Sequence, residues 1–405
     1  MARRTTRIIT AVAVTGIVVA AAAVATGTGS AGPDCDGLLR VAHRGSGGLA
    51  PENTAAAMRL AEPNGAGAFE VDVQLSADGR VVVMHDGDLS RTTDVAEVFP
   101  GREADPINSF TLAELETLDA GSWWGPDFAG ERIPTLDVVA EVATTDDITV
   151  TVELKDPDRN PGLVEAVHAE LTADSRWAEL MDAGRVIFFS FDAVALEKIQ
   201  EYYPQVPVAW VNSGTGDDAV LAEAAQWADF YGVDYRRLAD GDLERIEEHG
   251  MRSMLYTVDD PDAVVEQVAD GVDLIVGDFP NVLWAACGGP DAFPAANGVT
   301  ISTVVADPKG DDLKPETGEH LVLTNTADTA VDLGGYRIVD ALGHTVTIPP
   351  GRRISAGAAL TIYIGPGIGT ADRCYLDADE PLLDNKGDSL ALRTAAGELL
   401  DVYGY

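Results

Sequence analysis

The chain has 405 residues, 46% of them hydrophobic, and a formal net charge of −40 at pH 7 because 67 Asp and Glu residues outnumber 27 Lys and Arg residues. A single hydrophobic core seldom grows beyond about 250 to 300 residues, so this length predicts two domains. The electric field of such a negatively charged protein repels nucleic acid and anionic membrane surfaces and attracts cations, so we expect no nucleic-acid partner. Solubility in a salty or extracellular medium also accounts for the charge.

Residues 1–31 have the three-part layout of a secretory signal peptide. Three arginines within the first seven residues precede an almost wholly apolar run, Ile8–Ala25, and small residues follow with no charge before Asp34. The early pair of arginines is compatible with the twin-arginine export route. We expect a secreted or cell-surface protein cleaved near Ala31. The alternative is a membrane-anchored form, since the apolar run is just long enough to span a bilayer.

The three cysteines, Cys35, Cys287 and Cys374, do not have the spacing of metal ligands. Export permits disulfide bonds. Cys35 directly precedes the first predicted strand, and Cys287 directly follows the last predicted helix of the first domain. Because these two points are neighbours in a closed barrel, we predict a Cys35–Cys287 disulfide and a free Cys374. Three unpaired thiols are the alternative.

Short apolar strands alternate with helical patterns from residue 38 to residue 287. The predicted strands are Leu38–Ala42, Phe69–Leu75, Arg80–His85, Ile148–Leu154, Val186–Phe191, Val206–Val211, Phe230–Val233, Ser253–Val258 and Asp273–Val276. The helical stretches include Asn53–Ala61, Leu163–Leu171, Leu196–Tyr202, Val220–Trp227 and Ala263–Ala269. This alternation predicts an α/β fold, a parallel TIM-type (β/α)8 barrel over residues 36–287. A barrel has eight strands, so we expect the 80–85 strand to be a hairpin return outside it.

Two carboxylates and a histidine are predicted to meet on one face of the sheet. Glu70 and Asp72 are two residues apart in a strand and therefore point the same way. Asp78-Gly79 favours a two-residue turn with positive φ at both central positions, which would set Asp72 opposite His85. The alternative is a surface hairpin whose charges line up by accident.

A third carboxylate, Glu153, shares a strand face with Lys155 by the same period of two. His43, Glu70, Asp72 and Glu153 all fall near the carboxyl ends of predicted strands, where barrel enzymes build their sites. Three carboxylates converging on one cation would select a hard ion, Ca²⁺ or Mg²⁺, rather than zinc.

The motifs of this region resemble the glycerophosphodiester phosphodiesterase family across residues 38–284. They are His43-Arg44-Gly45, Pro51-Glu52-Asn53-Thr54, Glu70-Val71-Asp72, His85-Asp86, Arg91-Thr92-Thr93-Asp94, Gly130-Glu131-Arg132-Ile133-Pro134, Glu153-Leu154-Lys155, Ser190-Phe191, Tyr256-Thr257-Val258 and Gly277-Asp278-Phe279-Pro280. One departure is Tyr256, where the family more often has tryptophan. The resemblance implies metal-dependent hydrolysis of glycerophosphodiesters to sn-glycerol 3-phosphate and an alcohol.

Carried over residue by residue, the resemblance implies that Glu70, Asp72 and Glu153 hold one divalent cation, Ca²⁺ or Mg²⁺. It also implies that His43 and His85 are the catalytic acid and base, which predicts a bell-shaped pH dependence.

The resemblance implies further that Arg44 and Lys155 contact phosphate, a role to which the arginine fork is suited. Glu52 would orient a neighbouring ligand or the glycerol. Its neighbour Asn53 also has a local interpretation, since it precedes a helical stretch and is a strong N-cap residue.

The composition changes after Cys287. Residues 288–298 are rich in Gly, Pro and Ala and are predicted to be a linker. Residues 299–405 alternate strands with turns and predict an all-β immunoglobulin-like sandwich. Glu319–Asn325, Val331–Tyr336 and Leu383–Asp388 resemble the lamin-tail domain. We expect it either to tether the protein to a cell surface or polymer, or target it to its substrate, or to be a passive stabilising appendage.

Three other functions stay open on the sequence: a phospholipase D-like enzyme, a teichoic-acid-directed phosphodiesterase, and a surface-binding protein with an inactive barrel. Both histidines and all three carboxylates are present, which favours an enzyme. We expect a monomer that acts on a small-molecule substrate.

Overall fold

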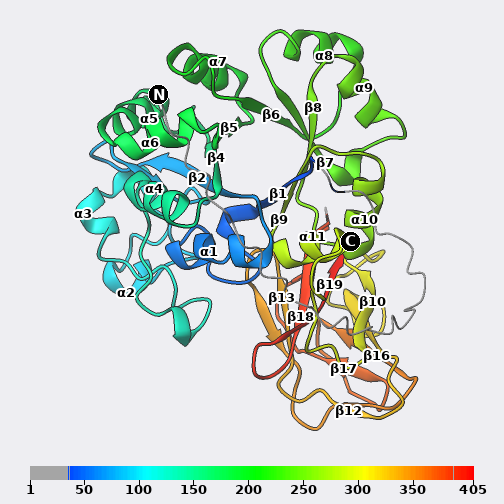
Figure 1. Ribbon diagram of the computed structural model, residues 1–405. Coiled ribbons are helices and arrows are strands. Elements are labelled where there is room, and N and C mark those ends of the chain that lie inside the picture. The colour runs from blue at the N-terminus through cyan, green and yellow to red at the C-terminus, as the bar shows by residue number, and fades with distance from the viewer. Residues whose placement is uncertain (1–34, 36, 386) are drawn as a thin grey trace, which may run out of the picture. The chain divides into compact units, whose positions relative to one another are not determined.

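Eight parallel strands close into a barrel in the first domain of the computed structural model, which describes residue 35, residues 37–385 and residues 387–405 (Figure 1). The barrel strands are β1 (Leu39–Ala42), β2 (Ala68–Leu75), β4 (Thr149–Leu154), β5 (Val186–Ser190), β6 (Val208–Asn212), β7 (Phe230–Asp234), β8 (Arg252–Tyr256) and β9 (Leu274–Gly277). Each pairs in parallel with its neighbours, and β1 pairs with both β9 and β2, which closes the ring. The predicted TIM-type barrel is confirmed. The predicted signal peptide, residues 1–31, lies outside the described residues.

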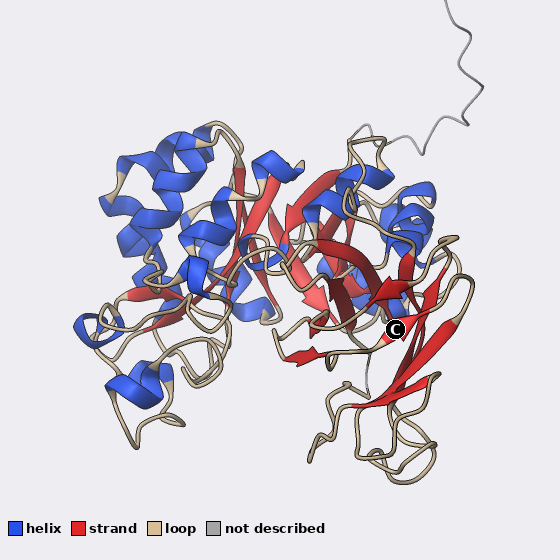
Figure 2. Cartoon of the chain, turned by 90° about the horizontal axis from the view of Figure 1, so that it is seen from below, coloured by secondary structure: helices blue, strands red, loops and turns tan. Residues whose placement is uncertain are grey.

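Helices follow the strands and cover their outer side (Figure 2). They are α1 (Ala55–Arg59), α4 (Leu136–Thr145), α5 (Leu163–Ala173), α6 (Ser175–Asp182), α7 (Ala193–Tyr202), α8 (Asp218–Ala224), α9 (Asp242–Glu248), α10 (Pro261–Ala269) and α11 (Pro280–Ala286), with the short α2 (Val95–Val98) and α3 (Leu112–Leu115) between β3 and β4. Several begin where a carboxylate accepts hydrogen bonds from the first turn, as Asp192 does for α7 and Asp260 for α10. Such caps satisfy amides that have no partner within the helix. None of the helices in the described part of the chain is both long and apolar enough to span a membrane.

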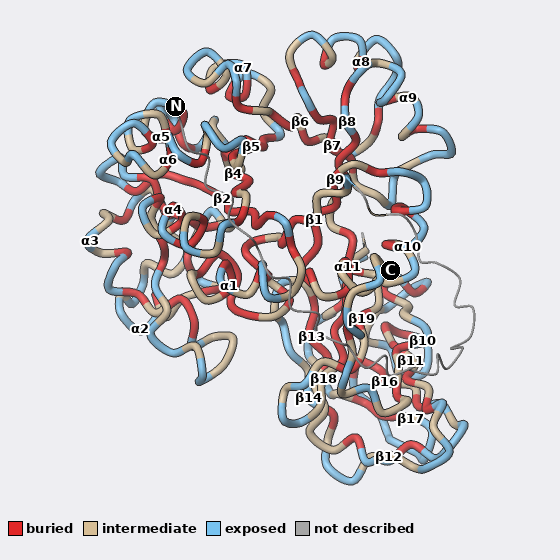
Figure 3. The backbone as a smooth tube through the Cα atoms, viewed as in Figure 1, coloured by how far each residue is buried: buried red, intermediate tan, exposed pale blue. Residues whose placement is uncertain are grey.

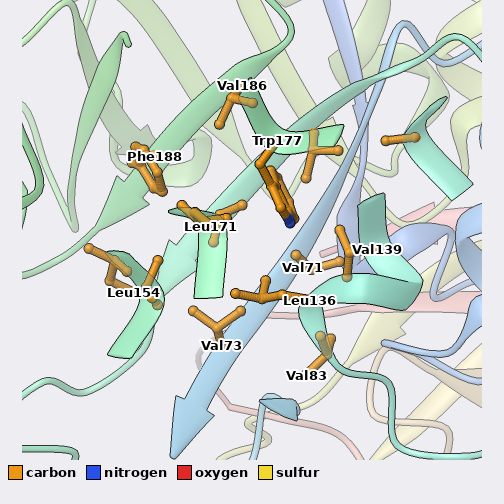
Figure 4. Packing of buried hydrophobic residues seen from close by; sticks show 14 of the residues in the cluster. Val71, Val73, Val83, Leu136, Val139, Leu154, Leu171, Trp177, Val186 and Phe188 are labelled. Carbon is orange, nitrogen blue, oxygen red and sulfur yellow. The ribbon is translucent and has the colours of Figure 1, made fainter. Parts of the chain in front are cut away.

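The period of two along β2 separates a packing face from a site face. Val71 and Val73 point outward and pack with Trp177 and Val139 under the helices (Figure 4). Ala68 points inward and belongs to a second buried cluster that fills the barrel interior. Glu70 and Asp72 follow Ala68 on the inward face, so they lie at the carboxyl end of the barrel. Figure 3 shows these strands as the buried centre of the domain.

The strand β3 (Val81–Val83) pairs antiparallel with β2 outside the barrel, as predicted, but in a different register. Leu75 faces Val81 rather than Val82, and the amide of Met84, not of His85, donates to the carbonyl of Asp72 at 2.9 Å. The predicted two-residue turn is wrong.

A three-residue loop, residues 77–79, connects the two strands of this hairpin. Only Gly79 has positive φ, at 74°, which is typical of a three-residue hairpin loop. The Ser76 hydroxyl accepts from the Arg80 amide at 2.9 Å and donates to Asp78 at 2.7 Å. These side-chain bonds stabilise a loop of three residues. The Asp78-Gly79 dipeptide alone predicts a loop of two.

The second domain consists of two four-stranded sheets that share one core. One sheet has the order β10 (Val299–Val305), β11 (His320–Asn325), β16 (Ala359–Tyr363), β17 (Arg373–Tyr375); the other has the order β14 (Thr345–Thr347), β13 (Arg337–Asp340), β18 (Ser389–Arg393), β19 (Leu399–Gly404). A short pair, β12 (Val331–Asp332) and β15 (Arg353–Ile354), completes it. Leu323 and Ile362 of the first sheet pack with Ile338 and Leu390 of the second. The predicted sandwich is confirmed, and it belongs to the same compact unit as the barrel.

Cys35 and Cys287 form a disulfide, and Cys374 is a buried free thiol, both as predicted. The bond links residues separated by 252 positions and so joins the two ends of the barrel domain.

Replacing Cys35 and Cys287 together by serine should lower the free energy of unfolding by about 2–4 kcal/mol, because the disulfide restricts the unfolded chain. Thermal and denaturant unfolding with and without reductant measures this. Reductant should lower the stability of the wild type and leave the double variant unchanged. Thiol titration in denaturant without reductant should find one thiol, Cys374, and a count of three would contradict the assignment.

Candidate active site

Three carboxylates converge at the carboxyl end of the barrel. One oxygen each from Glu70, Asp72 and Glu153 lies within 4.8 Å of the others, and Asp72 is paired in register with Glu153 on the neighbouring strand. Burial, followed by repulsion from the other two carboxylates, raises the pKa of Glu70 well above its ordinary value. Glu70 Oε1 is buried without a hydrogen-bond partner. An all-oxygen cluster with an unsatisfied buried oxygen fits a hard divalent cation.

Lys155 stands beside this cluster. Its Nζ lies 3.3 Å from Asp72 Oδ1 and 3.1 Å from Glu153 Oε1. The contact with Asp72 is close enough for an ion pair, although Oδ1 makes no hydrogen bond of good geometry. Burial opposes ionisation of Asp72, but the charges of Lys155, His85 and Arg44 together hold its pKa well below its usual range. At neutral pH, therefore, Asp72 is ionised.

Asn53 holds Asp72 rather than capping a helix. Its Nδ2 donates to Asp72 Oδ2 at 2.8 Å, and its Oδ1 accepts from the Asp72 amide at 3.2 Å. Thr54 is the N-cap of α1, since its hydroxyl accepts from the Ala57 amide. The predicted capping role of Asn53 is wrong. Its φ of 56° lies in the left-handed region, which asparagine tolerates better than most residues.

His43 lies directly after β1, in a short 3₁₀ turn. It is held by a carboxylate that comes from near the C-terminal end of the barrel sequence. Its Nδ1 lies 2.9 Å from Oδ1 of Asp278, the residue after β9. Burial, followed by the charge of Arg44, lowers the pKa of His43 to about 4, and burial raises the pKa of Asp278 to about 6. At neutral pH His43 is therefore neutral and Asp278 ionised, so we assign the proton to Nδ1 and a free lone pair to Nε2.

His85 is held in the same way by its neighbour in sequence. Its Nδ1 lies 2.8 Å from Asp86 Oδ1, and Arg91 Nε donates to Asp86 Oδ2 at 2.6 Å. Arg91 also donates two hydrogen bonds of 2.7 Å to Glu52. Burial, followed by the charge of Arg44, lowers the pKa of His85. Both histidines thus expose Nε2 and anchor Nδ1 on a carboxylate.

Arg44 connects the histidine network with the carboxylates. Its Nη1 donates to Glu52 at 3.0 Å, and its backbone amide donates to Glu70 Oε2 at 2.7 Å. Its φ of 48° is unusual for a residue with a side chain, so the backbone is held in a strained conformation to make that bond. Its Nε is buried without a hydrogen-bond partner, 3.9 Å from Asp72, which leaves a donor for an anionic oxygen.

The structure brings all eight predicted site residues to one end of the barrel. Both oxygens of Glu52 accept from arginines, Arg44 and Arg91. The bond to Arg44, a predicted phosphate contact, is compatible with the predicted role of Glu52 in orienting a neighbouring ligand, which stays a prediction. Glu52, His85 and Asp86 also approach one another closely, but Arg91 bonds to both acids of this group, which argues against a second cation there.

Asp86, Arg91 and Asp278 lie within motifs of the resemblance but have no predicted role there. A signal was available for two of them: Asp86 adjoins a predicted catalytic histidine, and Asp278 follows a barrel strand. For Arg91 the sequence offered no such signal.

This fold and this site define a barrel hydrolase equipped for an anionic substrate. Residues 43–282 match the model of the glycerophosphoryl diester phosphodiesterase family, and residues 293–405 match the lamin tail domain. The chain belongs to the glycerophosphoryl diester phosphodiesterase family, and it carries a lamin tail domain after the barrel.

Among its relatives is the glycerophosphodiester phosphodiesterase of Bacillus subtilis, 30% identical over 61% of this chain and 85% of that protein. The enzyme of the same name from Caldanaerobacter subterraneus is 34% identical over 60% of this chain and 96% of that protein. A solved phosphodiesterase from Oleispira antarctica, in complex with the product sn-glycerol-3-phosphate, is 29% identical, with a TM-score of 0.53 over 62% of this chain and 97% of that one.

Replacing Arg91 by methionine should destabilise the protein by about 3–5 kcal/mol at pH 7, because the buried Glu52 and the partly buried Asp86 would keep their charge and lose a partner. Hydrogen bonds and charge from Arg91 help to depress the pKa of both carboxylates. The stability that comes from these shifts is present above the unfolded pKa of about 4 and is lost as pH falls further. The difference between variant and wild type should therefore persist from pH 7 down to about pH 4 and shrink as pH falls below that value.

Urea unfolding at several pH values measures this difference. The matched control is Arg59→Met, which removes an exposed ion pair with Glu141 and should cost less than about 1 kcal/mol. A pH-independent loss in the Arg91 variant would contradict the electrostatic account.

Proposed function

We propose that this protein is an exported enzyme that hydrolyses glycerophosphodiesters to sn-glycerol 3-phosphate and an alcohol, with one divalent cation and two histidines. The observation that carries the proposal is the geometry of His43 and His85. Each has Nδ1 on a carboxylate, and both lie beside three carboxylates and two cationic side chains. The product bound to the Oleispira antarctica phosphodiesterase supports the same product here.

Glu70, Asp72 and Glu153 are the residues that would hold the cation, and Ca²⁺ and Mg²⁺ both suit their oxygens. When bound, the cation supplies positive charge close to the phosphoryl oxygens. Arg44 donates to a phosphoryl oxygen through its free Nε, and Lys155 adds a second positive charge. Both side chains stabilise the negative charge that grows on these oxygens in the transition state.

The two histidines divide the proton transfers. His43, neutral at neutral pH, accepts a proton from the nucleophile at Nε2. His85 donates a proton from Nε2 to the departing alcohol oxygen. Burial and Arg44 lower its pKa, and the carboxylates of Asp72 and Asp86 oppose this shift and so favour the protonated ring. The nucleophile is either water or the 2-hydroxyl of the substrate glycerol, which would form a cyclic phosphate first. Opposite protonation states of the two rings predict a bell-shaped pH dependence.

Export remains part of the proposal, since residues 1–31 lie outside the described residues. The disulfide between Cys35 and Cys287 supports it, because disulfides persist in oxidising compartments. A cell-surface or polymer partner of the sandwich is likewise proposed from its family alone.

Chelator should abolish release of sn-glycerol 3-phosphate from glycerophosphocholine, and added Ca²⁺ or Mg²⁺ should restore it. The same cation should raise the melting temperature, because a ligand that binds only the folded state stabilises it, by about 2.7 kcal/mol at 100 times the Kd.

Glu70→Gln should lose both effects of the cation, while Glu141→Gln, an exposed change on α4, should retain both. A chelated protein that remains fully active would contradict the metal dependence. A wild type inactive on several glycerophosphodiesters with either cation would leave a polymer-directed, lipid-directed or binding function.

A substrate with a good leaving group, glycerol phosphate esterified to p-nitrophenol, distinguishes the catalytic acid from the catalytic base. His85→Ala should lose roughly 10²- to 10⁴-fold in kcat with glycerophosphocholine and far less with the nitrophenyl ester, which needs no proton donor. His43→Ala should lose activity on both substrates alike. Steady-state kinetics of both variants measures this, and the opposite pattern would exchange the two assignments.

A further inference from the structure

The sandwich reaches the active site of the barrel. A cavity of about 120 Å³ is lined on one side by His43 and Arg44 of the barrel and on the other by Leu342, Asp388 and Ser389 of the sandwich. Residues from both domains therefore surround the space next to the proposed base.

A continuous line of hydrogen bonds runs from the sandwich to this histidine. Ser389 Oγ, on the first residue of β18, donates to Asp259 Oδ2 at 2.9 Å. Asp259 Oδ1 accepts from the backbone amide of Asp278 at 2.6 Å. Asp278 Oδ1 then lies 2.9 Å from His43 Nδ1. Ser389 and both acids are buried, so water does not readily replace any of these contacts.

Other contacts hold the sandwich in register with the barrel. The amide of Gly404 donates to Asp260 Oδ2 at 3.0 Å, and Arg91 donates to the carbonyl of Leu342 at 2.9 Å. Val339 and Val402 belong to the same buried cluster as barrel side chains. These bonds at separate points fix Ser389 opposite Asp259.

Asp259 needs the serine more than a surface acid would. Burial, followed by repulsion from Asp278, raises the pKa of Asp259 to about 8, and the bond from Ser389 opposes this shift. Without the hydroxyl, a buried carboxyl oxygen would have no donor, a condition that costs free energy. The carboxyl group would turn, and the Asp278 amide would lose its fixed acceptor.

We propose that Ser389 is a positioning residue for His43, acting through Asp259 and Asp278, so that the C-terminal sandwich completes the active site of the barrel. The inference rests on the proposed function, because it assigns a role to a residue of the sandwich in the reaction at His43. Under this inference the domain is not a passive appendage, and the proposed cell-surface or polymer partner would be an additional role.

Ser389→Ala should lower kcat for glycerophosphocholine about 10- to 100-fold, since small displacements of a catalytic group have effects of this size. KM should stay within about twofold, because the substrate's own contacts are unchanged. Ser389→Thr keeps the hydroxyl and should retain most of the activity. The matched control is Ser302→Ala, an exposed serine of the same domain whose side chain contacts only other sandwich residues.

A double-mutant cycle separates positioning from general weakening of the fold. In an Asp278→Ala background His43 has already lost its carboxylate, so Ser389→Ala should lower kcat no further. If Ser389→Ala lowers kcat by the same factor in both backgrounds, or leaves it unchanged in the wild type, the inference is overturned.

A readout without turnover tests the same contact if the enzyme proves inactive on its proposed substrates. In protein labelled with ¹⁵N-histidine, the His43 Nδ1–H signal is identified by its loss in Asp278→Ala. Ser389→Ala should broaden or shift that signal and leave the other histidine signals in place. An unchanged signal would overturn the inference, whereas an inactive wild type with a shifted signal would overturn only the proposed function.

Discussion

Buried negative charge is the constraint on which the rest of this site depends. Glu70 and Asp72 are almost fully buried side by side at the end of β2, an arrangement that repels itself. The surrounding residues compensate. Asn53 and Lys155 hold Asp72, and the backbone of Arg44 takes a left-handed conformation that brings its amide to Glu70. The carboxylates that suit a cation thus also dictate the local backbone and the positions of the cationic groups around them.

The two histidines share a design and differ in their surroundings. Each anchors Nδ1 on a carboxylate, which sets the orientation of the ring and presents Nε2. The partner of His85 belongs to a partly buried network with Arg91 and Glu52. The partner of His43 is backed by another buried acid and by the sandwich. The two rings are therefore the same residue type, each held by a carboxylate, with different groups behind that carboxylate.

The sandwich and the barrel are joined at the place where chemistry is proposed. A domain that served only as a tether would have no need to bury a serine against the acids behind His43. The hydrogen bonds of Ser389, Gly404 and Leu342 instead make the second domain part of the wall of the site. Differences between barrel enzymes with and without such a domain would then include the alignment of the base.

Much of the fold and part of the site followed from local patterns. Alternation of strands and helices predicted the barrel, and the period of two placed Glu70 with Asp72 and Glu153 with Lys155, because successive side chains of a strand point to opposite faces. The resemblance then predicted which residues act in catalysis, metal binding and phosphate binding. These roles stay predictions.

The tertiary structure alone decided the pairings. His43 meets Asp278 across 235 positions and Ser389 meets Asp259 across 130, and no local period encodes which strand ends become neighbours. Asn53 bonds to Asp72 instead of capping a helix, and the β2–β3 hairpin has one more loop residue than its dipeptide suggests. Local sequence determines which face of a strand a side chain occupies. Its bonding partner depends on which distant segments the closed barrel and the docked sandwich bring to that face.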